Sequence, residues 1–284
     1  MATVRFGLWR RLHGPVVGRE GHILRLPPRD GRGGCCRETL PIPHPPLQLL
    51  CEDCGYDLQA VRAASVCPEC GTAVASSLPT SRPGSPWQRR RTPGGWLGTL
   101  MAMRHPRAMF RSVRIESGRA WQLLVINVVV TSVIGTVAIM AGGPLSGHAS
   151  TAYALSFFGM SAGVLLALSV VEIFGIRFFG RRHGWRTDLG IATAVCGHAS
   201  YGWILAGLGV AFVWQWYQWC RVLDDWASAI NCPIMPSQLT PVLLGVSFFV
   251  GMLTFESLVY IGFRACRFAN RPGSDDESEC SDAA

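Results

Sequence analysis

The apolar positions of this chain are gathered into four long runs in its second half, separated by short polar segments. The runs lie at about 121–141, 153–176, 190–214 and 242–263. Each reaches the ~20 residues that an α-helix needs to cross a hydrocarbon core roughly 30 Å thick. The pattern therefore predicts an all-α transmembrane bundle of four spans, occupying residues 121–264.

The segment immediately before the first run, residues 98–120, has the pattern of a short amphipathic helix. Arg107 and Arg111 share one helical face, whereas Met109 and Phe110 lie together on another. A basic face beside an apolar face is typical of a helix that lies in the membrane interface. We therefore expect this segment to rest on the bilayer surface.

The remaining segments show no lasting helical or strand period. Residues 1–46 are rich in Arg, Gly and Pro and predict a disordered basic arm. Residues 76–97 are rich in Ser, Pro and Arg and predict a linker without a core. Residues 265–284 end in a run of acidic side chains and predict a disordered acidic tail.

The charges of the chain support a membrane protein and give its orientation. Only 15% of the 284 residues are charged, against 49% hydrophobic, and all 26 basic residues are Arg. Arginines cluster before the first span, between the second and third, and after the fourth, while the other two loops carry only Arg221. Because positive charge concentrates on the cytoplasmic side, both termini are expected there. The expected partners are the lipid bilayer and its anionic head groups.

A cysteine motif at residues 47–75 stands apart from the membrane pattern. The stretch "CEDCGYDLQAVRAASVCPEC" contains two Cys-x-x-Cys pairs, formed by Cys51, Cys54, Cys67 and Cys70. Four thiols at this spacing predict a zinc ribbon holding a structural Zn²⁺ ion. Disulfides or a redox pair are the alternatives, and the expected cytoplasmic side disfavours stable disulfides. Since so small a segment buries little apolar surface, the metal would supply its folding energy.

Four polar residues lie within the predicted spans, one on each. They are Asn127, Glu172, His198 and Glu256. At 1.5 Å per residue they come out about 6–12 Å from the nearest cytoplasmic end, so they are expected in the same half of the bilayer. One interpretation is an intramembrane polar cluster for protons or cations, and the other, which we favour, is a set of interhelical hydrogen bonds.

Two further cysteines, Cys220 and Cys232, share the third loop, which is expected to be extracytoplasmic. A disulfide between them is therefore a second cysteine hypothesis.

No catalytic motif accompanies these features. The chain has no His-Glu-x-x-His and no phosphate-binding glycine loop. Its one Gly-x-Ser-x-Gly, at 159–163, lies inside the second apolar run, whereas the nucleophile serine of that motif needs a strand-to-helix turn. The ribbon carries four acidic side chains against Arg62, so nucleic acid is not an expected partner. We therefore predict a non-enzymatic, membrane-tethered zinc-ribbon adaptor or scaffold that binds a cytoplasmic protein. The alternative is a small ion or proton-coupled transporter, which would need a homo-oligomer to enclose a path.

The stretch "GWLGTLMAMRHPRAMFRSVRIE" and the later "AVCGHASYGWIL" carry a family resemblance. They resemble the surface helix and a small-residue span of the bacterial members of the Yip family of membrane proteins, over roughly residues 98–264. The resemblance implies a role in membrane organisation or trafficking, without enzyme activity, in the bacterial inner membrane. Family members usually have five spans and a shorter third loop than this chain.

Overall fold

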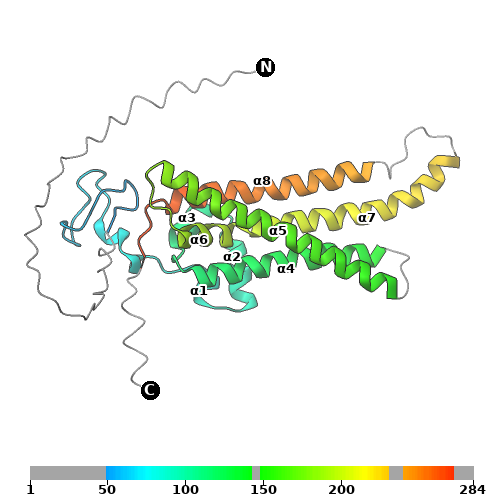
Figure 1. The fold of residues 1–284 in the computed structure, drawn as a ribbon, viewed down its shortest axis with the longest axis horizontal. Helices are drawn as coiled ribbons and strands as arrows, with labels where there is room; N and C mark the ends of the chain where they lie inside the picture. Colours follow the sequence, from blue (N-terminus) through cyan, green and yellow to red (C-terminus); the bar gives the residue numbers. More distant parts are fainter. Residues whose placement is uncertain (1–48, 143–147, 230–238, 272–284) are drawn as a thin grey trace, which may run out of the picture. The chain divides into compact units, whose positions relative to one another are not determined.

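The structure, a computed structural model, describes residues 49–142, 148–229 and 239–271. Two isolated antiparallel bridges join Leu50 to Asp57 and Val66 to Ala73. Everything else that is regular in the described part is helical (Figure 1). In chain order the elements are η1 (Val74–Ser77), η2 (Pro79–Ser81), α1 (Pro86–Arg89), α2 (Pro93–Ala102), α3 (Pro106–Ser112), α4 (Ser117–Gly142), α5 (His148–Arg182), α6 (Leu189–Ala199), α7 (Tyr201–Ala229) and α8 (Thr240–Cys266). The predicted basic arm and most of the predicted acidic tail lie outside the described residues.

The prediction of four membrane spans is confirmed at the level of helices. Four segments are long and apolar enough to cross a bilayer, and they are Ser117–Ala141, Thr151–Arg182, Leu189–Trp219 and Thr240–Cys266. Each overlaps one of the four apolar runs and extends it by several residues into the polar flanks. The chain therefore has the helices of an integral membrane protein.

The third span is broken into two helices, α6 and α7, at Ser200 (Figure 1). Two side chains near the break bond to backbone carbonyls of their own helix. His198 contacts the Ala194 carbonyl at 2.8 Å, and the Ser200 hydroxyl donates to the Gly197 carbonyl at 2.7 Å. Side chains that compete for helix carbonyls loosen the ladder and bend it, which explains the break.

Glycines allow the helices around the break to approach closely. A Cβ at Gly197 would collide with the backbone of Ala120 in α4, and one at Gly202 would collide with the backbone of Phe255 in α8. Residues 190–199 are all buried, so α6 is the central element of the bundle. The small residues of this span therefore serve close helix packing.

Residues 76–97 contradict the prediction of a linker without a core. Arg82, Ser85 and Gln88 are buried, as is Trp87. The Ser85 hydroxyl accepts the backbone N–H of Gln88, whose side chain accepts the backbone N–H of Ser85, and this capping box begins α1. The prolines that suggested a linker occupy the first turns of short helices, where proline is favourable.

The amphipathic helix forms as α3, but its apolar face does not point to lipid. Met109 and Phe110 are buried in the main core, and the Phe110 ring lies directly over Gly262 of α8. The basic residues Arg107 and Arg111 stay exposed. The expectation of a helix resting on the bilayer is wrong for the apolar face, because α8 covers it instead.

Candidate metal centre

Each Cys-x-x-Cys pair forms a tight knuckle with the same backbone geometry. In the first, the Gly55 N–H donates to the Cys51 carbonyl at 2.8 Å, and in the second the Gly71 N–H donates to the Cys67 carbonyl at 2.9 Å. Both glycines have positive φ, +83° and +73°. An L side chain is strained at such angles, so glycine after the second cysteine lets each turn close.

The two knuckles bring the four thiols together as the motif predicts. The sulfurs of Cys51, Cys54, Cys67 and Cys70 all lie within 4.8 Å of one another, and all four thiols are free. The Sγ atoms are 3.5 Å apart for Cys51 and Cys70, and 3.6 Å for Cys54 and Cys67. Tetrahedral thiolate zinc, with Zn–S bonds of about 2.3 Å, requires sulfurs about 3.8 Å apart. The cluster therefore fits one tetrahedral metal ion and leaves no ligand position open.

The thiols of this cluster differ in acidity. Desolvation raises the pKa of Cys54 to about 12, and it also raises the pKa of Cys51. The side chain and the backbone N–H of Thr72 lower the pKa of Cys70 to about 6. Since a metal ion binds thiolates, its uptake must displace protons from the high-pKa members.

The ribbon around the cluster has almost no apolar core of its own. Its buried hydrophobic residues are Leu58, Val74 and the two cysteines Cys51 and Cys67. Such a core is too small to fold a segment of this length alone. A bound metal and contacts with the rest of the chain would have to supply the remaining free energy of folding.

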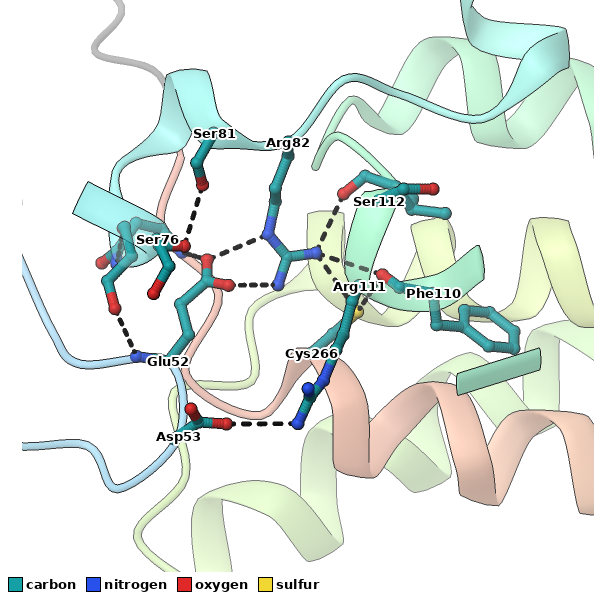
Figure 2. A network of polar contacts seen from close by, with 12 residues as sticks. Glu52, Asp53, Ser76, Ser81, Arg82, Phe110, Arg111, Ser112 and Cys266 are labelled. Carbon is teal, nitrogen blue, oxygen red and sulfur yellow. Dashed lines mark hydrogen bonds and ion pairs between the residues drawn. The ribbon is translucent and has the colours of Figure 1, made fainter. Parts of the chain in front are cut away.

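A buried ion pair joins the first knuckle to the helical bundle (Figure 2). The Arg82 guanidinium donates from Nε and Nη2 to the two Glu52 carboxylate oxygens at 2.9 and 2.8 Å. Its Nη1 donates to the carbonyls of Phe110 at 3.2 Å and Val113 at 2.9 Å. The side chains of Arg82 and Glu52 are only 2% and 16% exposed. Glu52, which follows the predicted metal ligand Cys51, is thus connected to the end of α3 through the Arg82 guanidinium.

Asn270, just beyond α8, makes a second connection to the ribbon. Its side-chain amide donates to the carbonyls of Leu50 at 2.7 Å and Ser77 at 2.8 Å, and its Oδ1 accepts the Leu50 N–H at 3.0 Å. Asn270 is 3% exposed. These paired bonds extend the backbone of the ribbon as a strand neighbour would, so the ribbon is docked on the bundle and is not carried on a loose arm.

The sequence did not indicate either docking residue. Arg82 is one of several arginines in a Ser/Pro-rich stretch, and Asn270 lies in what was expected to be a tail. The acidic residues of the ribbon, by contrast, were noticed for their charge alone. Two of them have specific partners, since Glu52 binds Arg82 and Asp53 binds Arg111 at 3.3 Å.

The intramembrane polar residues Asn127 and His198 are fully buried and bond to different partners. Asn127 accepts the Trp96 indole N–H at 2.7 Å and donates to the Ser200 hydroxyl at 2.8 Å. His198 contacts the Ser85 hydroxyl through Nε2 at 2.9 Å. Its Nδ1 faces the Ala194 carbonyl, which can only accept, so Nδ1 carries the proton and Ser85 donates to Nε2. Both residues tie the α1–α2 region to the spans.

Glu172 and Glu256 do not join those hydrogen bonds. Glu172 on α5 is half-buried, and Glu256 on α8 is exposed on the bundle surface. The structure therefore does not gather the four polar residues into one hydrogen-bonded cluster. The predicted disulfide between Cys220 and Cys232 lies outside the described side chains.

Comparison of the chain with protein families, with curated proteins and with solved structures finds no match in any of the three. The resemblance to the Yip family therefore stays a prediction.

Proposed function

We propose that this chain is a non-enzymatic membrane scaffold whose zinc-folded ribbon, docked on the bundle, presents its free side to a cytoplasmic protein partner. The observation that carries the proposal is that one knuckle of the ribbon is bonded to the bundle while the other is exposed. Glu52 and Leu50, at the first knuckle, are bonded to Arg82 and Asn270. The second knuckle, with Pro68 and Glu69, stays exposed.

Exposed apolar side chains on the ribbon support a protein partner. Val66 is 58% exposed and Tyr56 is 39% exposed, although few apolar residues are buried in the core of the ribbon. Aromatic and aliphatic anchors surrounded by polar groups are typical of protein interfaces. A four-thiolate site without an open ligand position supports a structural role for the metal over a catalytic one.

The direction of the ribbon and the wider role are parts of the same proposal. The alternation of Arg-rich and Arg-poor loops supports a cytoplasmic ribbon. The resemblance of residues 98–264 to the Yip family suggests that the partner acts in membrane organisation or trafficking. The transporter alternative receives no support from a shared polar cluster, since Asn127 and His198 bond elsewhere.

Site-specific photocrosslinking in cells tests the partner proposal. A photoreactive residue at Val66 should give a discrete protein adduct that disappears when Cys67→Ser removes a metal ligand. The same residue at Arg91, which is exposed in the turn before α2, is the matched control and should give none. Absence of a Val66 adduct, or an adduct that persists without the metal site, would contradict the proposal.

A further inference from the structure

A cavity of about 500 Å³ lies where the first knuckle meets the ends of α3 and α8. Its walls include Arg107 and Arg111 from α3, and Arg264 and Arg267 from the end of α8 and the turn beyond it. The ribbon contributes Glu52 and Asp53 to the lining. Figure 2 shows Arg111 directed to Asp53, beside the buried Arg82 pair. Cavities of this size commonly hold small ligands.

The charges of the lining leave an excess of guanidinium groups. Four arginines face two carboxylates, and the Glu52 carboxylate is already bonded to Arg82, which is not a lining residue. Only Arg111 has a carboxylate partner among the lining residues, because Asp53 is its ion-pair neighbour. A pocket walled by unneutralised arginines favours an anion.

The other three arginines bond to neutral groups or to none. Arg267 donates to the Asp53 backbone carbonyl, and Arg264 donates to the Tyr260 hydroxyl at 3.2 Å. Arg107 makes no ion pair or side-chain hydrogen bond with any residue that the structure describes. These guanidinium groups keep donors available for a ligand, and the planar fork of arginine suits the oxygens of a phosphate.

The position of the cavity along α8 indicates where the anion comes from. Tyr260 and Ile261 form part of its wall and belong to the span Thr240–Cys266. Tyr260 is 59% exposed on the outer surface of α8. Tyrosine and arginine near the end of a span are typical of the head-group region of a bilayer. The cavity therefore joins an arginine cluster to a surface that hydrocarbon would cover.

We propose that this cavity binds the phosphate of an anionic phospholipid, with the lipid chains leaving along Tyr260. The ribbon completes the site, because Asp53 orients Arg111 and Arg267 through its carboxylate and its carbonyl. The bound lipid stabilises the docked ribbon, and lipid and metal therefore favour each other's binding. This proposal depends on the docking of the ribbon and is independent of the protein partner.

Native mass spectrometry of the full chain in detergent tests the proposal. The probes are phosphatidylglycerol, zwitterionic phosphatidylcholine and inorganic phosphate, each titrated separately. We expect phosphatidylglycerol to bind tightly, with phosphatidylcholine at least tenfold weaker. The double variant Arg107→Gln/Arg264→Gln should weaken phosphatidylglycerol binding about thirtyfold, from the loss of two interfacial charges.

The matched control is Arg90→Gln/Arg91→Gln, which removes two exposed arginines outside the cavity and should leave binding within about twofold. Equal losses in both double variants would show diffuse attraction and overturn the site. Inorganic phosphate that binds as tightly as phosphatidylglycerol would overturn the lipid assignment. If the cavity variant loses its metal, Arg107→Gln alone serves in its place, and unchanged binding there would also contradict the proposal.

Discussion

Replacing Glu52 with Gln should release the ribbon from the bundle while leaving all four cysteines in place. The change removes the charge that balances Arg82, whose side chain is 2% exposed and lies 2.8 Å from the Glu52 carboxylate. Breaking a buried ion pair from one side costs about 3–5 kcal/mol, because the remaining charge stays buried without its counter-ion. Arg82 should then leave its site for water in a much larger fraction of molecules.

The reactivity of the Cys266 thiol can measure how often Arg82 leaves its site. Its thiol is buried at the end of α8 and lies 3.8 Å from the Arg82 guanidinium. When opening is faster than labelling, the labelling rate follows the population of the open form. Maleimide labelling of Cys266, followed by peptide mass mapping, should therefore be between about a hundredfold and a few thousandfold faster in Glu52→Gln.

Asp53→Asn is the matched control for this experiment. It removes a carboxylate from the adjacent position, but its ion pair with Arg111 is exposed, at 46% and 69% for the two side chains. An exposed pair contributes about 0–1 kcal/mol, so labelling of Cys266 should rise less than about fivefold. Similar rates in the two variants would refute the conclusion that the buried pair holds the ribbon in place.

The glycines of the knuckles, the cap of α1 and the cysteine thiols can each be tested by a single change. Gly71→Ala should destabilise the fold of the ribbon by about 1–2 kcal/mol through backbone strain alone. Gly55→Ala should in addition make Cys266 react with maleimide, because a Cβ at that position meets the Phe268 ring. Equal labelling of Cys266 in the two variants would contradict this. Ser85→Ala should lower the thermal midpoint in detergent by several degrees, since it removes the cap of α1 and leaves His198 without its Nε2 partner; an unchanged midpoint would count against that bond. Metal uptake by the metal-free protein at pH 7 should release protons. Thiols such as Cys54, whose pKa is raised to about 12, are protonated in the metal-free form and must lose that proton to bind the metal as thiolates. Calorimetry in buffers of different ionisation enthalpy measures this release, and affinity should fall as pH falls; a pH-independent affinity would argue against thiolate ligation.

The features that the sequence predicted correctly are local ones. The four cysteines lie in two short knuckles, each closed by a glycine, so their spacing along the chain determines how the sulfurs meet. The spans follow from length and apolar composition. In both cases the physical cause acts over a few neighbouring residues or over one continuous segment.

The docking of the ribbon could not be predicted because its bonds join distant residues. Arg82 and Glu52 are 30 positions apart, and Asn270 and Leu50 are 220 apart. A buried arginine in a Ser/Pro-rich segment has the same local sequence as an exposed one, so composition favoured a linker. Similarly, the apolar face of α3 suited both lipid and protein, and only the presence of Gly262 beneath Phe110 decides for protein.

The polar residues of the spans show how placement along the chain differs from placement in space. Asn127 and His198 were expected in one layer of the bilayer; both are buried, and Asn127 bonds to Ser200, two positions after His198. Their partners, Trp96 and Ser85, come from the segment before the first span. A count of residues along a helix gives depth but does not give the face of the helix.

The most direct test of this account is the metal content of the detergent-purified full chain, measured beside a Cys51→Ser/Cys54→Ser variant. We expect one zinc ion per chain, which is lost in the variant, together with rapid labelling of Cys266 in the metal-free protein. A chain purified without chelator that contains no metal, or one that keeps its metal without Cys51 and Cys54, would contradict it.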